Sequence, residues 1–181
     1  MSASGLDEWI AATRSDWGPL STEVVGDCQR NLADLVTSPA TEPWLAALHR
    51  DAPLSQELYR DPDSGFVLLA HTEQAGLYRP PHDHGLGWVI YAVQQGEIEM
   101  GSYARIEGSD GQFQLVRRGS TLIKPGMVQV YLPGDIHDTR CVTGPALLLR
   151  FTERDLKREE RQFHRIARYV KHGDAWAAGY A

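Results

Sequence analysis

Residues 56–151 consist of short runs rich in β-branched, aromatic and leucine side chains, separated by Gly, Pro and Asp. About nine such runs follow one another without helical periodicity between them, which is typical of a closed or two-sheet all-β body. A βαβ fold is excluded because its parallel strands need helical crossovers. The runs are QELYR, GFVLLAH, GWVIYAV, EIEMGSYARI, QFQLVRR, STLIK, VQVYL, HDTRCV and PALLLRF.

Helical patterns flank this stretch on both sides. Apolar residues recur at helical spacing within residues 1–52, and they predict three small helices there,. Residues 153–172 predict one C-terminal helix packed on the barrel. Its apolar face comprises Leu156, Phe163, Ile166 and Val170. A length of 181 residues favours a single domain over 1–181,.

Net charge and cysteine content limit the classes of binding partner and the cellular location that we expect. The formal net charge is -6, which argues against a general attraction to nucleic acid or to an anionic membrane,. Two cysteines, Cys28 and Cys141, are too few for a disulfide framework, and the first residues lack a signal-peptide pattern,. No apolar run is long enough to span a bilayer. We expect a cytoplasmic protein, a monomer or homodimer, whose partners are small molecules.

Three of the seven histidines have a distinctive context. His82 and His84 form an HxH in Pro80–Gly85, and in an extended strand both imidazoles point to the same side. His137 follows the turn Leu132–Ile136, where a third ligand could enter from another strand. A lone HxH is more often a chance polar turn than a metal site, but this pair does not stand alone. The remaining histidines, which are His49, His71, His164 and His172, lack such surroundings.

The spacing around these histidines resembles the two motifs of the cupin superfamily. The first, HxH-x4-E-x6-G, is matched from His82 to Gly96 except that Val89 replaces the glutamate. The second, G-x5-P-x-G-x2-H-x3-N, is matched at its glycines and histidine, and it departs in two places. The matching residues are Gly126, Gly134 and His137, and the departures are Leu132, with a proline one place later, and Cys141. The resemblance covers roughly residues 56–151 and implies a double-stranded β-helix, a jelly-roll barrel with metal ligands His82, His84 and His137.

The missing glutamate narrows the resemblance to the cysteine dioxygenase-like cupins. These proteins also use three histidines, and their sequences read similarly at Pro81–Gly85, Trp88 and Gly134–His137. Two of their features have no counterpart here. Val89 stands where mammalian-type enzymes place a cross-linking cysteine, and Leu147–Phe151 stands where they carry Ser-x-His-x-Tyr.

A three-histidine site has a chemical consequence. Neutral imidazoles leave a divalent ion with its full positive charge, so the site favours an anionic ligand. Three ligands on one face leave open positions on Fe(II) for a chelating substrate together with O₂. We therefore expect Fe(II), although the same imidazoles also suit Zn, Ni, Mn and Cu.

Other residues are candidates for substrate contacts. Strand alternation places Tyr91 on the side of the ligand pair, and Tyr131 is expected to line the opposite wall, so both are candidate acid/base groups. Arg60 lies where thiol dioxygenases carry a carboxylate-binding arginine, and Arg150 competes for that role. Trp88 is either a wall of the pocket or barrel packing.

Three functions fit these residues. The first is an Fe(II)-dependent dioxygenase that oxidises a small anionic substrate, a thiol in the first instance. The second is a metal-dependent lyase or isomerase that works without O₂ and uses Tyr91 or Tyr131. The third is a ligand-binding cupin without catalysis, because fold alone does not decide function.

Overall fold

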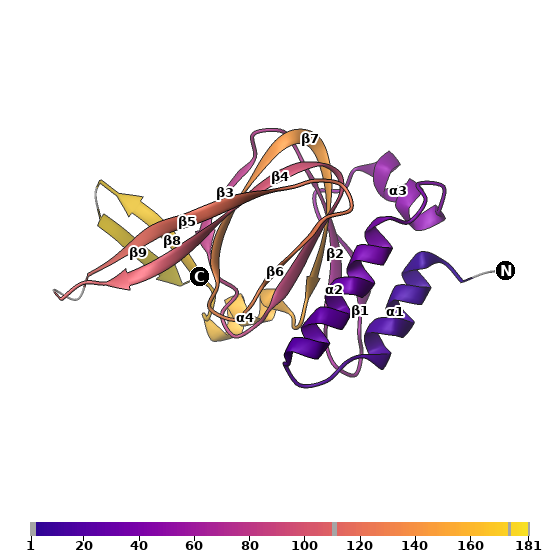
Figure 1. Cartoon of the computed structure of the whole chain (residues 1–181), viewed down its shortest axis with the longest axis horizontal. Coiled ribbons are helices and arrows are strands. Elements are labelled where there is room, and N and C mark those ends of the chain that lie inside the picture. Colours follow the sequence, from indigo (N-terminus) through magenta and orange to yellow (C-terminus); the bar gives the residue numbers. More distant parts are fainter. Residues whose placement is uncertain (1–2, 110–111, 174, 181) are drawn as a thin grey trace.

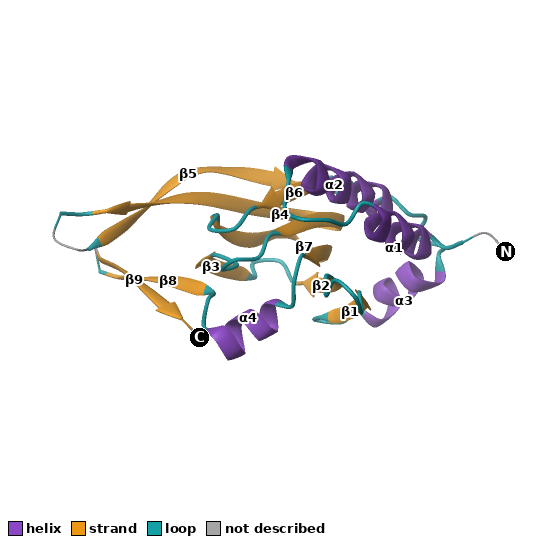
Figure 2. Cartoon of the chain, turned by 90° about the horizontal axis from the view of Figure 1, so that it is seen from below, coloured by secondary structure: helices purple, strands orange, loops and turns teal. Residues whose placement is uncertain are grey.

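The computed structural model describes residues 3–109, 112–173 and 175–180. The expected N-terminal helices are confirmed, and their bounds are α1 Gly5–Ser15, α2 Thr22–Val36 and α3 Pro43–Asp51. Ser4 caps the N-terminus of α1. Its side-chain oxygen accepts a hydrogen bond from the backbone N–H of Asp7, and the Asp7 carboxylate accepts one from the backbone N–H of Ser4,. The three helices gather at one end of the molecule, where α1 and α2 cover one face of the sheet (Figures 1 and 2).

Seven antiparallel strands form the barrel. Their bounds are β1 Gln56–Arg60, β2 Val67–Glu73, β3 Tyr78–His82, β4 Val89–Glu107, β5 Phe113–Ile123, β6 Val128–Tyr131 and β7 Ile136–Thr152. The two longest strands, β4 and β7, pair along most of their lengths. β2 and β3 pair with opposite halves of β7, and β5 and β6 with opposite halves of β4. The sheet curls round an interior as the predicted jelly-roll barrel does (Figure 1).

The two faces of this sheet have different neighbours. Ile90 packs in one core cluster with Trp88 and Phe151, and helical residues complete that cluster. Val89 and Tyr91 belong to a second cluster inside the barrel. Successive side chains of a strand point to opposite faces, so the outer face holds the helical layer and the inner face forms the interior.

Three pairs of runs that were predicted as separate strands are continuous, and they form β4, β5 and β7. In β4, Gly96 adopts a φ of +79° and the pairing register with β7 shifts beside it. A Cβ at this position would lie 2.6 Å from the Cβ of Ala146. Glycine therefore bends the strand and lets its neighbour approach, where the sequence suggested a turn.

Strand β3 was not among the predicted runs. Its sequence contains Pro80 and Pro81, which have no N–H to donate to a ladder. The register with β7 is interrupted between Arg79 and His82, so the strand pairs through the residues on either side of the prolines. Prolines make such a segment look like a turn in the sequence.

The prediction of one helix over residues 153–172 is wrong in its second half. The structure has α4 at Leu156–Phe163, followed by a hairpin of β8 Ala167–His172 and β9 Ala175–Tyr180. His164 ends the helix in a left-handed conformation, with φ +48°. Of the predicted apolar face, Phe163 and Val170 are exposed. Ala167 and Tyr169 are buried instead, because β8 extends the barrel sheet at the edge of β3.

No helix in the described part of the chain is long and apolar enough to cross a bilayer. The assignment of residues 1–181 to one domain stays a prediction.

Candidate metal centre

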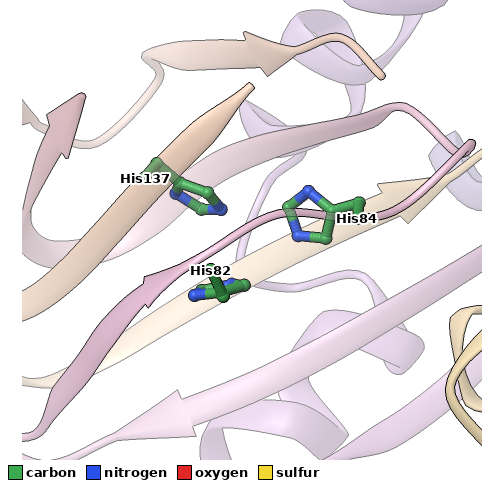
Figure 3. Close-up of side chains that lie close together, drawn as sticks. All are labelled: His82, His84 and His137. Carbon is green, nitrogen blue, oxygen red and sulfur yellow. The ribbon is translucent and has the colours of Figure 1, made fainter. Parts of the chain in front are cut away.

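Three histidines converge inside the barrel (Figure 3). His82 ends β3, His84 lies in the following turn, and His137 is the second residue of β7, where it pairs directly with His82. One ring nitrogen from each lies within 4.8 Å of the others. The ring centroids are separated by 4.5 to 5.3 Å. Such a group could hold one metal ion.

Each imidazole has a free nitrogen to offer a metal. Nδ1 of His82 lies 2.9 Å from the carbonyl oxygen of Pro80, which can only accept, so the proton is on Nδ1 and the lone pair is on Nε2,. Nδ1 of His84 and both ring nitrogens of His137 are buried without a hydrogen-bond partner among the described residues. A metal ion would satisfy these nitrogens, so the residues fit the group that the sequence suggested.

The protonation state suits ligation as well. Burial lowers the pKa of His82, and burial together with the neighbouring His82 lowers the pKa of His84 and of His137 well below the usual value. The positive charge of Arg150 acts in the same direction on all three. The rings are therefore neutral near pH 7, and neutral imidazole is the ligating form.

No Asp or Glu of the described residues belongs to this group. Val89, the residue at the glutamate position of the motif, is fully buried in the inner cluster with Tyr91 and Tyr131. Its side chain has no metal-binding atom. The structure thus places an apolar group on the inner face of β4, where the common motif carries a carboxylate.

Tyr91 contacts the histidines directly. Its hydroxyl oxygen lies 3.3 Å from Nε2 of His84, and its ring centroid lies 5.4 Å from that of His137. Burial raises the pKa of Tyr91, and the charge of Arg150 opposes this shift. The phenol therefore carries its proton near neutral pH and can donate a hydrogen bond at the site.

Tyr131 lies behind His137 instead of facing the cavity. The two rings stack with centroids 3.9 Å apart and an interplanar angle of 23°. Burial raises the pKa of Tyr131. This tyrosine, which the sequence suggested as an acid/base group, is placed to position the imidazole of His137.

A cavity of about 480 Å³ opens beside the histidines. Its walls come from β2, β3, β4, β7 and β8, together with the segment before β1 and the first turns of α4. The charged and titratable lining residues are His71, Glu73, Tyr78, Arg79, His82, His84, Tyr91, Arg150, Lys157, Glu160 and Arg168. His82 and His84 are part of this wall, so a molecule in the cavity can reach a metal held by the three histidines.

The three predicted substrate-binding residues lie in different places relative to the cavity. Arg150 lines the cavity, and its Nε is buried without a partner among the described residues. Arg60 does not reach the cavity, because its guanidinium pairs with Glu57 at 2.7 Å and with Asp155 at 2.9 Å. The resemblance to thiol dioxygenases suggested Arg60 from its position alone, and local carboxylates hold this side chain away from the cavity.

Trp88 faces away from the cavity. It is only 2% exposed and stacks on Trp17 at 6.2 Å, with Phe151 at 5.2 Å. It precedes the inward-facing Val89 by one residue, so alternation turns it toward the helical layer. Of the two alternatives for Trp88, the structure supports barrel packing.

Sequence reasoning missed two residues of β2. His71 and Glu73 both line the cavity and are 9% and 2% exposed, respectively. Glu73 pairs with Arg79 at 2.9 Å. No alternation in the sequence reveals them, because Thr72 lies between them and every residue of β2 is buried,.

Comparison with known proteins finds only distant structural similarity. No protein-family model matches it, and no curated protein matches it. Solved structures resemble part of it. KdgF from Halomonas sp. is 18% identical over 54% of this chain and 74% of its own length, with a TM-score of 0.43. The Schizosaccharomyces pombe Cnp3 cupin domain is 17% identical over 60% and 65%, with a TM-score of 0.43.

A third example is the hydroquinone 1,2-dioxygenase PnpCD, solved with Cd²⁺ and 4-hydroxybenzonitrile. It is 16% identical over 51% of this chain and 60% of that chain, with a TM-score of 0.40. The aligned part spans less than two thirds of the Cnp3 and PnpCD chains. At these identities and scores, the function of this chain must be argued from its own site.

Proposed function

We propose that this chain is a non-haem Fe(II)-dependent dioxygenase-like enzyme that oxidises a small anionic substrate with O₂. A thiol is the first candidate for the group that meets the metal. One observation carries the proposal: His82, His84 and His137 bring free ring nitrogens within 4.8 Å of one another beside a cavity, and no described carboxylate joins them.

The electrostatics of the cavity support an anionic substrate. The carboxylates of Glu73 and Glu160 are paired with Arg79 and Arg168. Arg150 and Lys157 also line the cavity, and no described carboxylate pairs with either of them. The wall is therefore net positive before any metal binds, and a divalent ion on three neutral imidazoles adds to this charge.

Ferrous ion, when bound, supplies open coordination positions at which a substrate and O₂ can meet. The side chains of the protein would bind the ion, position its ligands and contact the substrate. The three imidazoles would hold the ion, and Tyr131 stacks on His137 and holds its ring in place. Tyr91 presents a protonated phenol beside His84 and can donate a hydrogen bond to a bound anion.

The contact of Tyr91 with His84 also favours a second candidate, a metal-dependent lyase or isomerase without O₂. A metal held by the three histidines would supply Lewis acidity for such a reaction, and Tyr91 would exchange a proton with the substrate. A ligand-binding role without catalysis makes no use of this proton. The partners of both enzyme proposals are small molecules, with the chain as a monomer or homodimer.

Oxygen consumption separates these candidates. Iron-loaded protein is tested with a panel of small thiols and diketones, beside the metal-free protein and His137→Ala. We expect consumption with at least one anionic substrate, and its loss in both controls. Metal analysis shows whether iron was bound in each sample. If iron-loaded protein consumes no O₂ with any of these compounds, the dioxygenase proposal is wrong.

A further inference from the structure

We infer that the cavity contains a second binding subsite, made by His71, Glu73 and Arg150, that recognises a hydroxycarboxylate. It would hold the carboxylate of a ligand at Arg150 and its hydroxyl groups at the two β2 residues. The inference rests on the proposed function only in taking this cavity as the substrate site, and it names the class of substrate.

Strand register brings the three residues onto one wall. Across the β2–β7 ladder, Leu69 pairs with Arg150 and His71 pairs with Leu148. Directly opposed residues of antiparallel strands share a face, and so do alternate residues of one strand. His71, Glu73 and Arg150 therefore project into the same space, and all three line the cavity.

Each of the three has a buried polar atom without a hydrogen-bond partner among the described residues. These atoms are Nε2 of His71, Oε2 of Glu73 and Nε of Arg150. Burying such atoms without a partner costs free energy, and they are usually satisfied by a ligand or by ordered water. Three of them in one cavity, outside the histidine cluster, are a set that a single polar ligand could satisfy.

The chemical sense of each atom can be assigned. Nδ1 of His71 lies 3.3 Å from the carbonyl oxygen of Leu54, which only accepts, so Nδ1 carries the proton and Nε2 is an acceptor,. Burial lowers the pKa of His71 to about 3, and the charge of Arg150 contributes, so the ring is neutral. Oε2 of Glu73 is an acceptor as well, whereas Nε of Arg150 is a donor.

Two acceptors require a ligand with donors, and one cationic donor requires an anion. Hydroxyl groups suit the acceptors better than an ammonium group does. Glu73 is already neutralised by Arg79, with contacts of 2.9 and 3.1 Å, and Arg150 and Lys157 add positive charge nearby. These cations would repel an ammonium group, whereas they attract a carboxylate.

The spacing sets the length of the ligand. The row of Arg150 and the row of His71 are two residues apart on β2, which is about 7 Å, and Glu73 lies a further two residues along. A chain of about six carbons, roughly 6 Å long when extended, thus covers the spacing from the row of Arg150 to that of His71, and the side chain of Glu73 has to extend back along the wall to meet its far hydroxyl group. His82, His84 and Tyr91 line the same cavity, so this wall adjoins the histidine cluster.

The test measures binding to metal-free protein by titration calorimetry. Three ligands with six-carbon chains are compared: gluconate, hexanoate and 6-aminohexanoate. We expect gluconate to bind at least about tenfold more tightly than either of the others, because only gluconate carries hydroxyl donors on a carboxylate chain. Equal or tighter binding of hexanoate or 6-aminohexanoate, or no binding of gluconate, would overturn the inference.

Variants assign the effect to residues. In Glu73→Gln, the amide can still accept from Arg79 but turns a donor toward the ligand, so the preference for gluconate over hexanoate should fall toward equality. Arg150→Gln should weaken the binding of both gluconate and hexanoate and leave the ratio of their affinities unchanged. Glu99→Gln is the matched control, because Glu99 also pairs with an arginine, Arg117 at 3.0 Å, but does not line the cavity.

An unchanged preference in Glu73→Gln, or an equal loss in Glu99→Gln, would also contradict the subsite. Because no metal is present in these measurements, they succeed or fail independently of oxygen consumption. Failure of the dioxygenase proposal alone would leave the preference for gluconate intact.

Discussion

His137→Ala tests the metal centre most directly, because His137 alone comes from β7, whereas His82 and His84 are two residues apart. In the metal-free protein the substitution has two opposing effects. It removes the stacking on Tyr131, worth about 1 kcal/mol, and leaves a small cavity,. It also removes two buried nitrogens without partners, each of which costs roughly 1–3 kcal/mol,. We expect the free energy of unfolding to change by about 1 kcal/mol or less.

The metal-loaded protein should respond differently. A metal that binds only the folded state adds about 2.7 kcal/mol to the free energy of unfolding when its free concentration is a hundred times its dissociation constant. Loss of one of three ligands should weaken binding at least about a hundredfold, since even residues behind the ligands contribute 10–100-fold. At the same concentration the variant then gains only about 0.4 kcal/mol.

The assay is urea unfolding of wild type and variant, with and without Zn²⁺ as a redox-inert probe. His49→Ala is a suitable control, because His49 is an exposed histidine of α3 outside the barrel. It should leave the stabilisation by Zn²⁺ unchanged. If Zn²⁺ stabilises His137→Ala as much as it stabilises the wild type, His137 is not a ligand and the three-histidine site is refuted.

Three further predictions follow from the burial of single side chains. Val89→Glu should destabilise the metal-free protein and raise the metal content retained after dialysis, because it places a carboxylate on the inner face; unchanged metal content would show that position 89 does not face the metal,. The pKa of His71 is about 3 in the folded state, below its unfolded value of about 6.5, so its contribution to stability is present above pH 6.5 and is lost as the pH falls toward 3,. Between pH 7 and pH 5, the free energy of unfolding of the metal-free wild type should therefore fall by about 2 kcal/mol more than that of His71→Phe. An equal fall in both proteins would contradict this. Trp88→Ala should cost about 3–5 kcal/mol of stability without changing activity per folded molecule, because Trp88 packs on Trp17; a loss of activity at full stability would place it at the site,.

The histidine cluster could be predicted from the sequence because its geometry is largely local. The HxH keeps His82 and His84 two residues apart at the end of β3, and the turn around Gly134 before His137 marks the start of another strand,. Predicting that this strand lies beside β3 depended on predicting the barrel, and the succession of short strands in the sequence was sufficient for that. The prediction of an inward Tyr91 used strand alternation.

The β2 wall could not be predicted in this way. All seven residues of β2 are buried, since helices cover one face and the cavity lies under the other. A strand buried on both faces loses the alternation of polar and apolar residues that would reveal its orientation. His71 and Glu73 were therefore indistinguishable from buried polar residues of a core until their cross-strand partners were known.

The strand bends explain how one strand can serve both subsites. In β7, His137 and Thr139 lie on the site's side at odd positions, whereas Leu148 and Arg150 do so at even positions. The pairing of β4 with β7 shifts register between Val93 and Ile98, and the extra residues there reverse the parity of both strands,. Strict alternation through β7 would have turned Arg150 toward the helices whenever His137 faced the metal. The irregular segment near Gly96 is thus what allows the metal ligand and the anion-binding arginine to share one cavity.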